Sequence, residues 1–235
     1  MPETETPRSL LAALLEPLGA LVTLAPRDRL LHQRGSSYEA NVQPLAGAAG
    51  LGLLAERLTG RARVRLSGAL WRDRELPDWL AIAIRFLGQE GAEQDMLFAT
   101  VRQPLTTLLS PATTDVHDFL ANDYYAVSAV EADDVGKLRF QLVSEKVHFP
   151  GPTREERLAR AVAVGAARFE LQGEVASGTW VGVSRVVLDG PADEREPLRF
   201  DPFRAGRGMR PSGPVQTMRR LLRSAAWPLR TLAVR

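Results

Sequence analysis

The sequence predicts an α+β fold built on a closed or strongly curved antiparallel β-barrel of about eight strands, with helices inserted late and at the C-terminus. The chain has 235 residues and is 45% hydrophobic, which is enough to bury one large core. Stretches in which apolar and polar residues alternate follow one another at short intervals, and this period of two is typical of half-buried strands. Turn-forming residues separate these stretches, as expected for antiparallel neighbours.

The first half of the chain supplies the clearest strands. Residues 37–45 and 62–70 alternate between apolar and polar positions. Residues 79–87 are almost entirely apolar, which is typical of a strand buried on both faces. Residues 95–101 are predicted to form the next strand.

The period of the hydrophobic pattern changes in the middle of the chain. Residues 104–110 and 113–123 are predicted to be helical, and a Thr or Asp within 113–115 is the candidate N-cap of the second helix. Residues 124–132 either extend that helix or begin a strand.

Strand patterns return in the second half. Residues 137–149 alternate again, and residues 167–175 and 179–190 are predicted to form a hairpin through the turn at 176–178. A helix is expected at 153–166, because this stretch opens with a Thr-x-x-Glu capping box before an apolar face.

The two ends of the chain are expected to lie outside the barrel. Residues 8–16 are predicted to form a short docking helix. Residues 198–213 are irregular and rich in Gly and Pro, and residues 214–232 are predicted to form a helix broken near Pro228.

These patterns divide the chain into three expected parts. Residues 1–28 form an N-terminal helix and arm, residues 29–203 form the barrel domain, and residues 204–235 form a basic arm and helix packed on the barrel. The last part holds eight arginines and no acid, so the remaining 203 residues carry 22 bases against 28 acids. An acidic body is therefore expected to carry a basic C-terminal segment.

Composition excludes several classes of function. The chain has no cysteine, which rules out disulfides, thiolate nucleophiles and Cys-bound metal centres. No apolar run approaches the roughly 20 residues of a membrane-spanning helix, and the N-terminus lacks the early basic residues of a signal peptide. A cytoplasmic location is the expectation.

Only three histidines occur, at 32, 117 and 148, and none has the spacing of a metal-binding pair. The sequence has no phosphate-binding loop and no Gly-x-Ser-x-Gly motif. His117 is expected at the surface of a polar helix, and His148 is expected to be structural at the end of a strand. His32 enters the first strand and is the candidate for chemistry.

If the first two strands pair, His32 converges with Arg29, Arg65 and Ser67 on one wall of the barrel. A serine hydroxyl bonded to one ring nitrogen would fix the tautomer of the imidazole and orient its other nitrogen. Guanidinium groups beside it suit a ligand that carries carboxylates or phosphates. The plainer interpretation is a histidine at a strand edge beside exposed arginines.

Four motifs in order resemble those of the haem catalases. RLLHQRG, at residues 29–35, resembles the segment that carries the distal histidine, and VRLSGAL, at residues 64–70, resembles the strand that carries its serine partner. LPDWLAIAIRFLGQEGAEQDMLFAT, at residues 76–100, resembles the next two strands. FDPF, at residues 200–203, and the arginine-rich last helix are similar to the C-terminal part of small catalase-related proteins.

The resemblance implies roles for individual residues on the distal side of a haem. Arg29 and Arg65 match the arginines that face the haem propionates, His32 matches the distal histidine, and Ser67 matches its hydroxyl partner. The second distal residue of the family, an asparagine, falls at Thr100, or at Ala99 if the register slips.

The proximal side departs from the family pattern. The family's axial iron ligand is a tyrosine four residues after an arginine in the last helix. Here Arg219 is followed at that distance by Arg223, and Arg223 by Trp227, so the axial tyrosine is missing. A guanidinium or an indole cannot replace a phenolate on iron. Arg219 and Arg223 would instead add positive charge, which would suit an anionic ligand.

The sequence therefore favours a degenerate catalase-like barrel protein without catalase activity, whose distal-type pocket binds haem weakly or another anionic small molecule. The first alternative is a haem-dependent peroxidase or hydroperoxide-processing enzyme whose axial ligand comes from His117, His148, Tyr124 or Tyr125. The second alternative is association with a membrane surface or nucleic acid through the basic tail. The plainer interpretation of the tail is a helix that docks on the acidic body of the same chain. Nucleic acid is the less favoured partner, and a second copy of the chain is a further expected partner.

Overall fold

The computed structural model describes residues 35–48, 50–69, 75–88, 92–102, 110–175, 178–193, 200–201, 203–213 and 216–217. The N-terminal residues with Arg29 and His32, and the last helix with Arg219 and Arg223, lie outside these ranges. So do the helices expected at 8–16, in most of 104–110 and in nearly all of 214–232, and the three-part division of the chain is therefore not tested.

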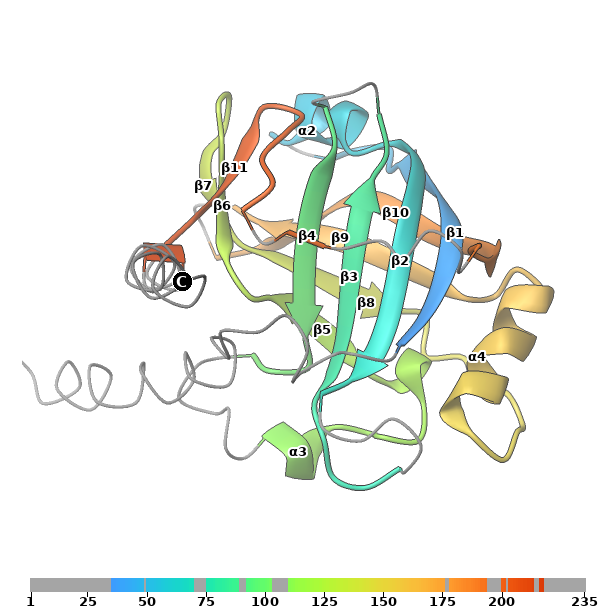
Figure 1. Ribbon diagram of the computed structural model, residues 1–235. Coiled ribbons are helices and arrows are strands. Elements are labelled where there is room, and N and C mark those ends of the chain that lie inside the picture. The colour runs from blue at the N-terminus through green and yellow to red at the C-terminus, as the bar shows by residue number, and fades with distance from the viewer. Residues whose placement is uncertain are drawn as a thin grey trace, which may run out of the picture.

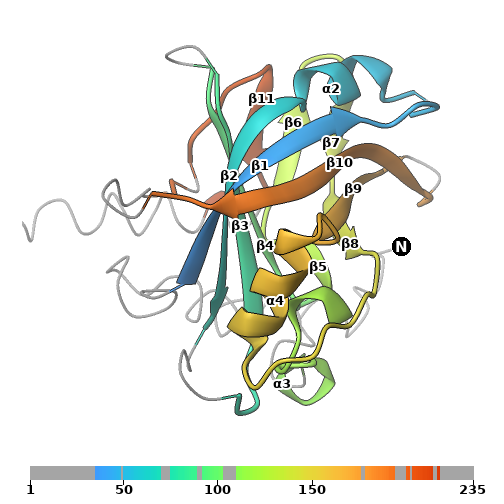
Figure 2. The ribbon, with the colours of Figure 1, turned by 90° about the vertical axis from the view of Figure 1, so that its right-hand side faces the viewer.

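Eight strands close into one antiparallel barrel, which confirms the predicted fold class (Figures 1 and 2). Around the barrel the order is β1, β10, β9, β8, β5, β4, β3, β2, so the first strand pairs with the last strand of the barrel. The bounds are β1 Gly35–Pro44, β2 Gly60–Gly68, β3 Leu80–Phe86, β4 Gln94–Ala99, β5 Asp123–Ala126, β8 Phe140–Ser144, β9 Arg168–Glu174 and β10 Trp180–Pro191.

The barrel forms because each strand presents apolar residues on one face. In β2, Ala62, Val64 and Leu66 are at most 1% exposed and belong to the hydrophobic core. The partner positions Ile82 and Ile84 of β3 lie opposite Leu66 and Val64 and are equally buried. Alternation along a strand sends the intervening residues to the outside of the barrel.

A small second sheet packs beside the barrel. It contains β6 Ala129–Ala132, β7 Gly136–Leu138 and β11 Met209–Ser212, in the order β11, β6, β7. The stretch 124–132 therefore forms strands rather than a helical extension. The prediction that residues 198–213 are irregular throughout is wrong, because β11 pairs with β6.

The described helices are short. They are α2 Gly52–Arg57, α3 Ser110–Thr113, the 3-10 helix η2 Phe119–Ala121 and α4 Arg154–Ala163. The Thr153 hydroxyl accepts a hydrogen bond from the Glu156 N–H, so Thr153 is the N-cap of α4, which is the first half of the predicted capping box. No helix within the described ranges is long and apolar enough to cross a membrane.

The predicted helix over residues 113–123 is wrong. α3 ends at Thr113, and the Asp115 carboxylate accepts from the His117 N–H in a turn. Asp118 then caps η2 by accepting from the Leu120 N–H. Short polar side chains satisfy the backbone here, which is the usual reason that Asp and Asn favour turns over helix interiors.

One irregular segment crosses the outside of the barrel in front of β4 (Figure 1). We call residues 200–208 the strap. The Asp201 N–H donates to the Asp95 carboxylate of β4 at 2.6 Å, and the Gly206 N–H donates to the side chain of Gln94 at 2.9 Å. The side chain of Arg207 then reaches the carbonyls of Arg57, Thr59 and Leu87. The described residues of the strap are thereby held at Asp201, Gly206 and Arg207.

Candidate functional site

The outer face of the first four strands carries an area of mostly small side chains. Strand register defines two rows. One row runs Gly35, Ser67, Ala81, Ala99 across β1 to β4, and the next runs Ser37, Arg65, Ala83, Leu97. We call these eight residues the outer platform. Figure 1 shows the four strands side by side in this order.

Ser67 and Arg65 share this outer face because they are two residues apart in β2. Ser67 is only 5% exposed, and Arg65 is partly buried. The structure therefore brings together the hydroxyl and one of the guanidiniums that the sequence selected. Both lie on the outside of the barrel wall, whereas the inside is filled by the apolar core.

Gly35 allows β1 to pack closely against Ser67 of β2. A Cβ on Gly35 would lie 2.4 Å from the Leu66 carbonyl oxygen and 2.9 Å from the Ser67 Cβ, so only glycine fits at this position. His32 is three residues earlier, and an extended chain covers at most about 11 Å over three residues. His32 lies outside the described residues, and chain length alone limits its backbone to about 11 Å from Gly35.

Thr100 follows the last residue of β4 and does not continue the row of Ser67. Its backbone N–H donates to the Leu80 carbonyl, and its hydroxyl accepts from the Leu80 N–H at 3.2 Å. The Thr114 hydroxyl donates to it at 2.8 Å. The structure thus joins Thr100 to the start of β3 and to the turn after α3. The residue that shares the row of Ser67 is Ala99.

Ion pairs border the platform on one side. The next row along the strands contains Glu39, Arg63, Arg85 and Asp95. The Arg63 guanidinium donates to Glu39 at 2.7 Å, and Arg85 holds Asp95 through two bonds of 2.6 and 2.7 Å. Hydrogen bonding to Asp95 raises the pKa of Arg85. Glu39 and Asp95 are therefore each paired with an arginine of the same row.

The strap covers the buried half of this border. Asp95 is fully buried, and its carboxylate also accepts from the strap at Asp201. The Phe200 ring lies under the Arg85 guanidinium at 5.4 Å, a cation–π contact. The outer platform therefore ends at this row of ion pairs.

Tyr125 extends the row of Ser67 and Ala99 onto β5. Burial raises the pKa of Tyr125, and Asp123 adds to this effect, while Arg102 opposes it. The Arg102 guanidinium lies 5.9 Å from the centre of the Tyr125 ring. An aromatic ring and a cation thus stand at the β5 end of the row.

The other ionisable groups proposed as iron ligands are occupied elsewhere. Tyr124 is fully buried in the barrel and donates to the Phe119 carbonyl at 2.7 Å. Burial raises its pKa well above the ordinary value. His117 pairs with Glu75, and His148 pairs with Asp118 at 2.9 Å. His117 lies in a turn and not in the predicted helix, and 63% of its side chain is exposed.

Within the described ranges, no group of three or more His, Asp or Glu side chains is placed to hold a metal ion. The outer platform offers a hydroxyl, a guanidinium and a floor of small side chains, and the first two are groups that the resemblance implies on one side of a haem. Among the groups expected on the opposite side, Tyr124 and both described histidines are bonded to other groups, and Tyr125 shares the face of Ser67. We therefore derive no step through iron.

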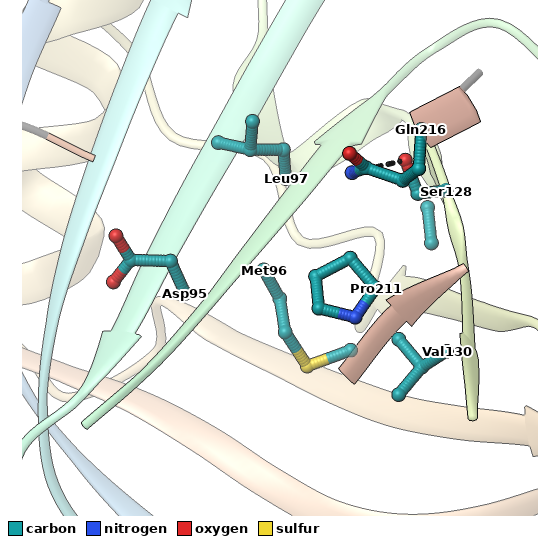
Figure 3. A pocket seen from close by; sticks show the side chains of 8 residues that line it. Asp95, Met96, Leu97, Ser128, Val130, Pro211 and Gln216 are labelled. Carbon is teal, nitrogen blue, oxygen red and sulfur yellow. Dashed lines mark hydrogen bonds between the residues drawn. The ribbon is translucent and has the colours of Figure 1, made fainter. Parts of the chain in front are cut away.

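A small hollow lies between β4 and the second sheet (Figure 3). Its volume of about 20 Å³ admits roughly one water molecule. The Gln216 amide donates to the Ser128 hydroxyl at 2.9 Å across one side, and Met96 and Val130 line another. This hollow is too small for an organic ligand.

Sequence reasoning missed two alanines of the site, because Ala81 and Ala83 enter it only through strand register. It named Tyr125 only as a possible iron ligand and did not place it beside Ala99. The Arg85–Asp95 pair has a local signal, since these opposite charges are ten residues apart in two consecutive predicted strands. Nothing local signals the strap, because Asp201 is 106 residues from Asp95.

The closed barrel with this outer platform defines a catalase-like fold. The crystal structure of a fungal catalase matches with a TM-score of 0.60 and 13% identity over 93% of this chain. Catalase A from Saccharomyces cerevisiae matches with a TM-score of 0.54 and 12% identity, also over 93% of this chain.

The chain spans 61% and 63% of the lengths of these two catalases. At such low identity the likeness shows the fold alone. No protein-family model matches the chain, and no curated protein matches its sequence.

Proposed function

We propose that this protein is a degenerate catalase-like barrel protein without catalase activity, which binds haem weakly or another flat anionic small molecule on the outer platform. The observation that carries the proposal is that Arg65 and Ser67 share one outer face, with Gly35 packed against Ser67. His32 and Arg29, which precede Gly35 in the sequence and lie outside the described residues, are proposed to join the same face.

The chemistry of these groups suits such a ligand. A guanidinium binds a carboxylate through two parallel hydrogen bonds, and Arg65 is partly withdrawn from water, which strengthens the attraction. Ala81, Ala83 and Ala99 carry only a methyl group each, so a flat ring can approach the sheet closely. The Ser67 hydroxyl is the partner that would hold the His32 imidazole in one tautomer.

Catalase turnover is not part of the proposal. That chemistry needs an anionic axial ligand that supports the oxidised iron. The sequence offers Arg223 and Trp227 at the positions where the family has its tyrosine. The peroxidase alternative would need His117, His148, Tyr124 or Tyr125. Since the first three are bonded to other groups, only Tyr125 is left, and it lies on the same face as Ser67.

Binding of haem is tested by titrating the purified protein with hemin and following its visible spectrum. We expect micromolar binding and no peroxide disproportionation above that of hemin alone. Arg65→Met should weaken binding about tenfold, because a charged hydrogen bond contributes about 1.5–3 kcal/mol. Arg139→Met is the control, since Arg139 pairs with Glu174 away from the platform and its side chain is 62% exposed.

Two results would reject the proposal. One is the absence of any binding of hemin by a folded protein. The other is tight stoichiometric binding with rapid peroxide breakdown, which would favour the enzyme instead.

A further inference from the structure

We propose that Tyr125 and Arg102 form a second contact point for the ligand of the outer platform, and that the ligand is recognised by its flat ring and its acidic groups, not by a metal within it. This inference rests on the proposed function and adds residues that the catalase resemblance does not select.

Geometry places Tyr125 at the end of the row that contains Ser67. Ser67 lies opposite Ala81, Ala81 opposite Ala99, and Ala99 opposite Tyr125. Adjacent strands are about 4.8 Å apart, so about 14 Å separates the backbones at the two ends of this row. Only two methyl groups project between them. A flat ligand of that width would touch the Ser67 side at one edge and Tyr125 at the other.

Tyr125 has the properties of a ligand contact. Its neighbour in β5, Tyr124, is buried in the core, whereas Tyr125 remains partly exposed on the outer face. Burial raises the pKa of Tyr125, so its phenol is neutral near pH 7 and offers an apolar ring together with a hydrogen-bond donor. Such rings contribute large contact areas in binding sites.

Arg102 adds a positive charge at the same end. Its guanidinium lies 5.9 Å from the centre of the Tyr125 ring, within the range of a cation–π contact. Arg102 is exposed, so its charge is available to an anionic group that approaches over the ring. The nearby acid Asp123 is held by Lys146 at 2.6 Å.

The charges around the platform therefore complement an anion. Arg65 lies near one end and Arg102 at the other. The acids of the bordering row, Glu39 and Asp95, are bonded to Arg63 and Arg85. None of these contacts requires a metal, because guanidiniums recognise acids and the alanine floor recognises a flat surface.

The test compares hemin with protoporphyrin IX, which has the same ring and acids but no iron. Both are titrated into the full-length protein, with fluorescence as the readout for protoporphyrin and absorbance for hemin. We expect dissociation constants within about threefold of each other. Tyr125→Ala and Arg102→Met should each weaken both ligands about tenfold, and Tyr125→Phe, which keeps the ring, should remain within about threefold of wild type.

Arg139→Met serves as the matched control for a lost surface arginine, and thermal unfolding verifies that each variant is folded. If hemin binds and protoporphyrin does not, recognition depends on iron and the inference is wrong, while the proposed function stands. If both bind and Tyr125→Ala and Arg102→Met match wild type, the second contact point is wrong. If neither ligand binds, the proposed function is wrong, and this inference, which rests on it, is wrong as well.

Discussion

Gly35 and Ser67 lie directly opposite each other in β1 and β2, so close that a Cβ on Gly35 would stand 2.9 Å from the Cβ of Ser67. The same Cβ would be 2.4 Å from the backbone oxygen of Leu66, which cannot move aside as a flexible side chain can. The backbone at the start of β1 is thereby packed tightly against β2 at Ser67.

Gly35→Ala is expected to lower the free energy of unfolding by about 1–3 kcal/mol, the range seen when a well-packed site is overfilled. Hemin binding should weaken as well, because β1 and β2 must separate where the site begins. Urea unfolding and the hemin titration measure the two effects. Gly190→Ala is the control, since a Cβ on Gly190 would meet no atom of another segment within 4 Å. Equal behaviour of the two variants would contradict the close approach.

Asp95→Ala is expected to cost about 3–5 kcal/mol, because it leaves the buried Arg85 guanidinium without its carboxylate. The variant also removes the acceptor for the Asp201 N–H, so the strap should become more sensitive to proteolysis. Chemical denaturation and limited proteolysis are the measurements. Glu174→Ala breaks an ion pair whose arginine is 62% exposed and should cost under about 1 kcal/mol. Similar decreases in the free energy of unfolding for both variants would show that burial of the Arg85–Asp95 pair has no energetic consequence.

Glu75→Gln is expected to change the dependence of stability on pH. Burial acts to raise the pKa of Glu75, but the hydrogen bonds from His117 and the Arg154 N–H, with the charge of Arg157, lower it overall. A lowered folded-state pKa stabilises the protein above the unfolded-state value near 4.5, and this contribution is lost as the pH falls through the folded-state pKa.

The difference in unfolding free energy between wild type and Glu75→Gln should therefore be largest near pH 7 and shrink below about pH 4.5. Urea unfolding at a series of pH values measures it. His117→Ala keeps the contacts of Glu75 with Arg154 and Arg157, so it should retain part of the dependence. A difference that stays constant from pH 7 to pH 3.5 would reject this account.

Most barrel strands could be predicted from the sequence because their two faces differ in polarity. The alternation in β1 and β2, and the hairpin of β9 and β10, appear directly in the order of apolar residues. β5 and β6 were ambiguous, since Ala and Glu favour helices locally while pairing with β4 and β11 makes this stretch extended. Asp115 was a candidate helix cap, and the structure uses it in a turn, while Asp118, which the sequence did not single out, caps a 3-10 helix.

The site was harder to predict than the fold. Ser67 and Arg65 share a face because their spacing of two residues allows no other arrangement in a strand. Thr100 and Ala99 differ by one residue, and β4 ends between them, so only Ala99 belongs to the row of Ser67. The contact of Asp201 with Asp95 has no local signal at all, because it depends on the closed barrel.

Closure of the barrel also sets the order in which this protein can fold during its synthesis. β1 leaves the ribosome early, yet its second neighbour, β10, is translated after all the other barrel strands. Until then both ends of the growing sheet carry unpaired backbone groups, which bind other extended chains readily. Nascent chains that end before β10 are therefore expected to be prone to aggregation, because transiently exposed strand edges favour it.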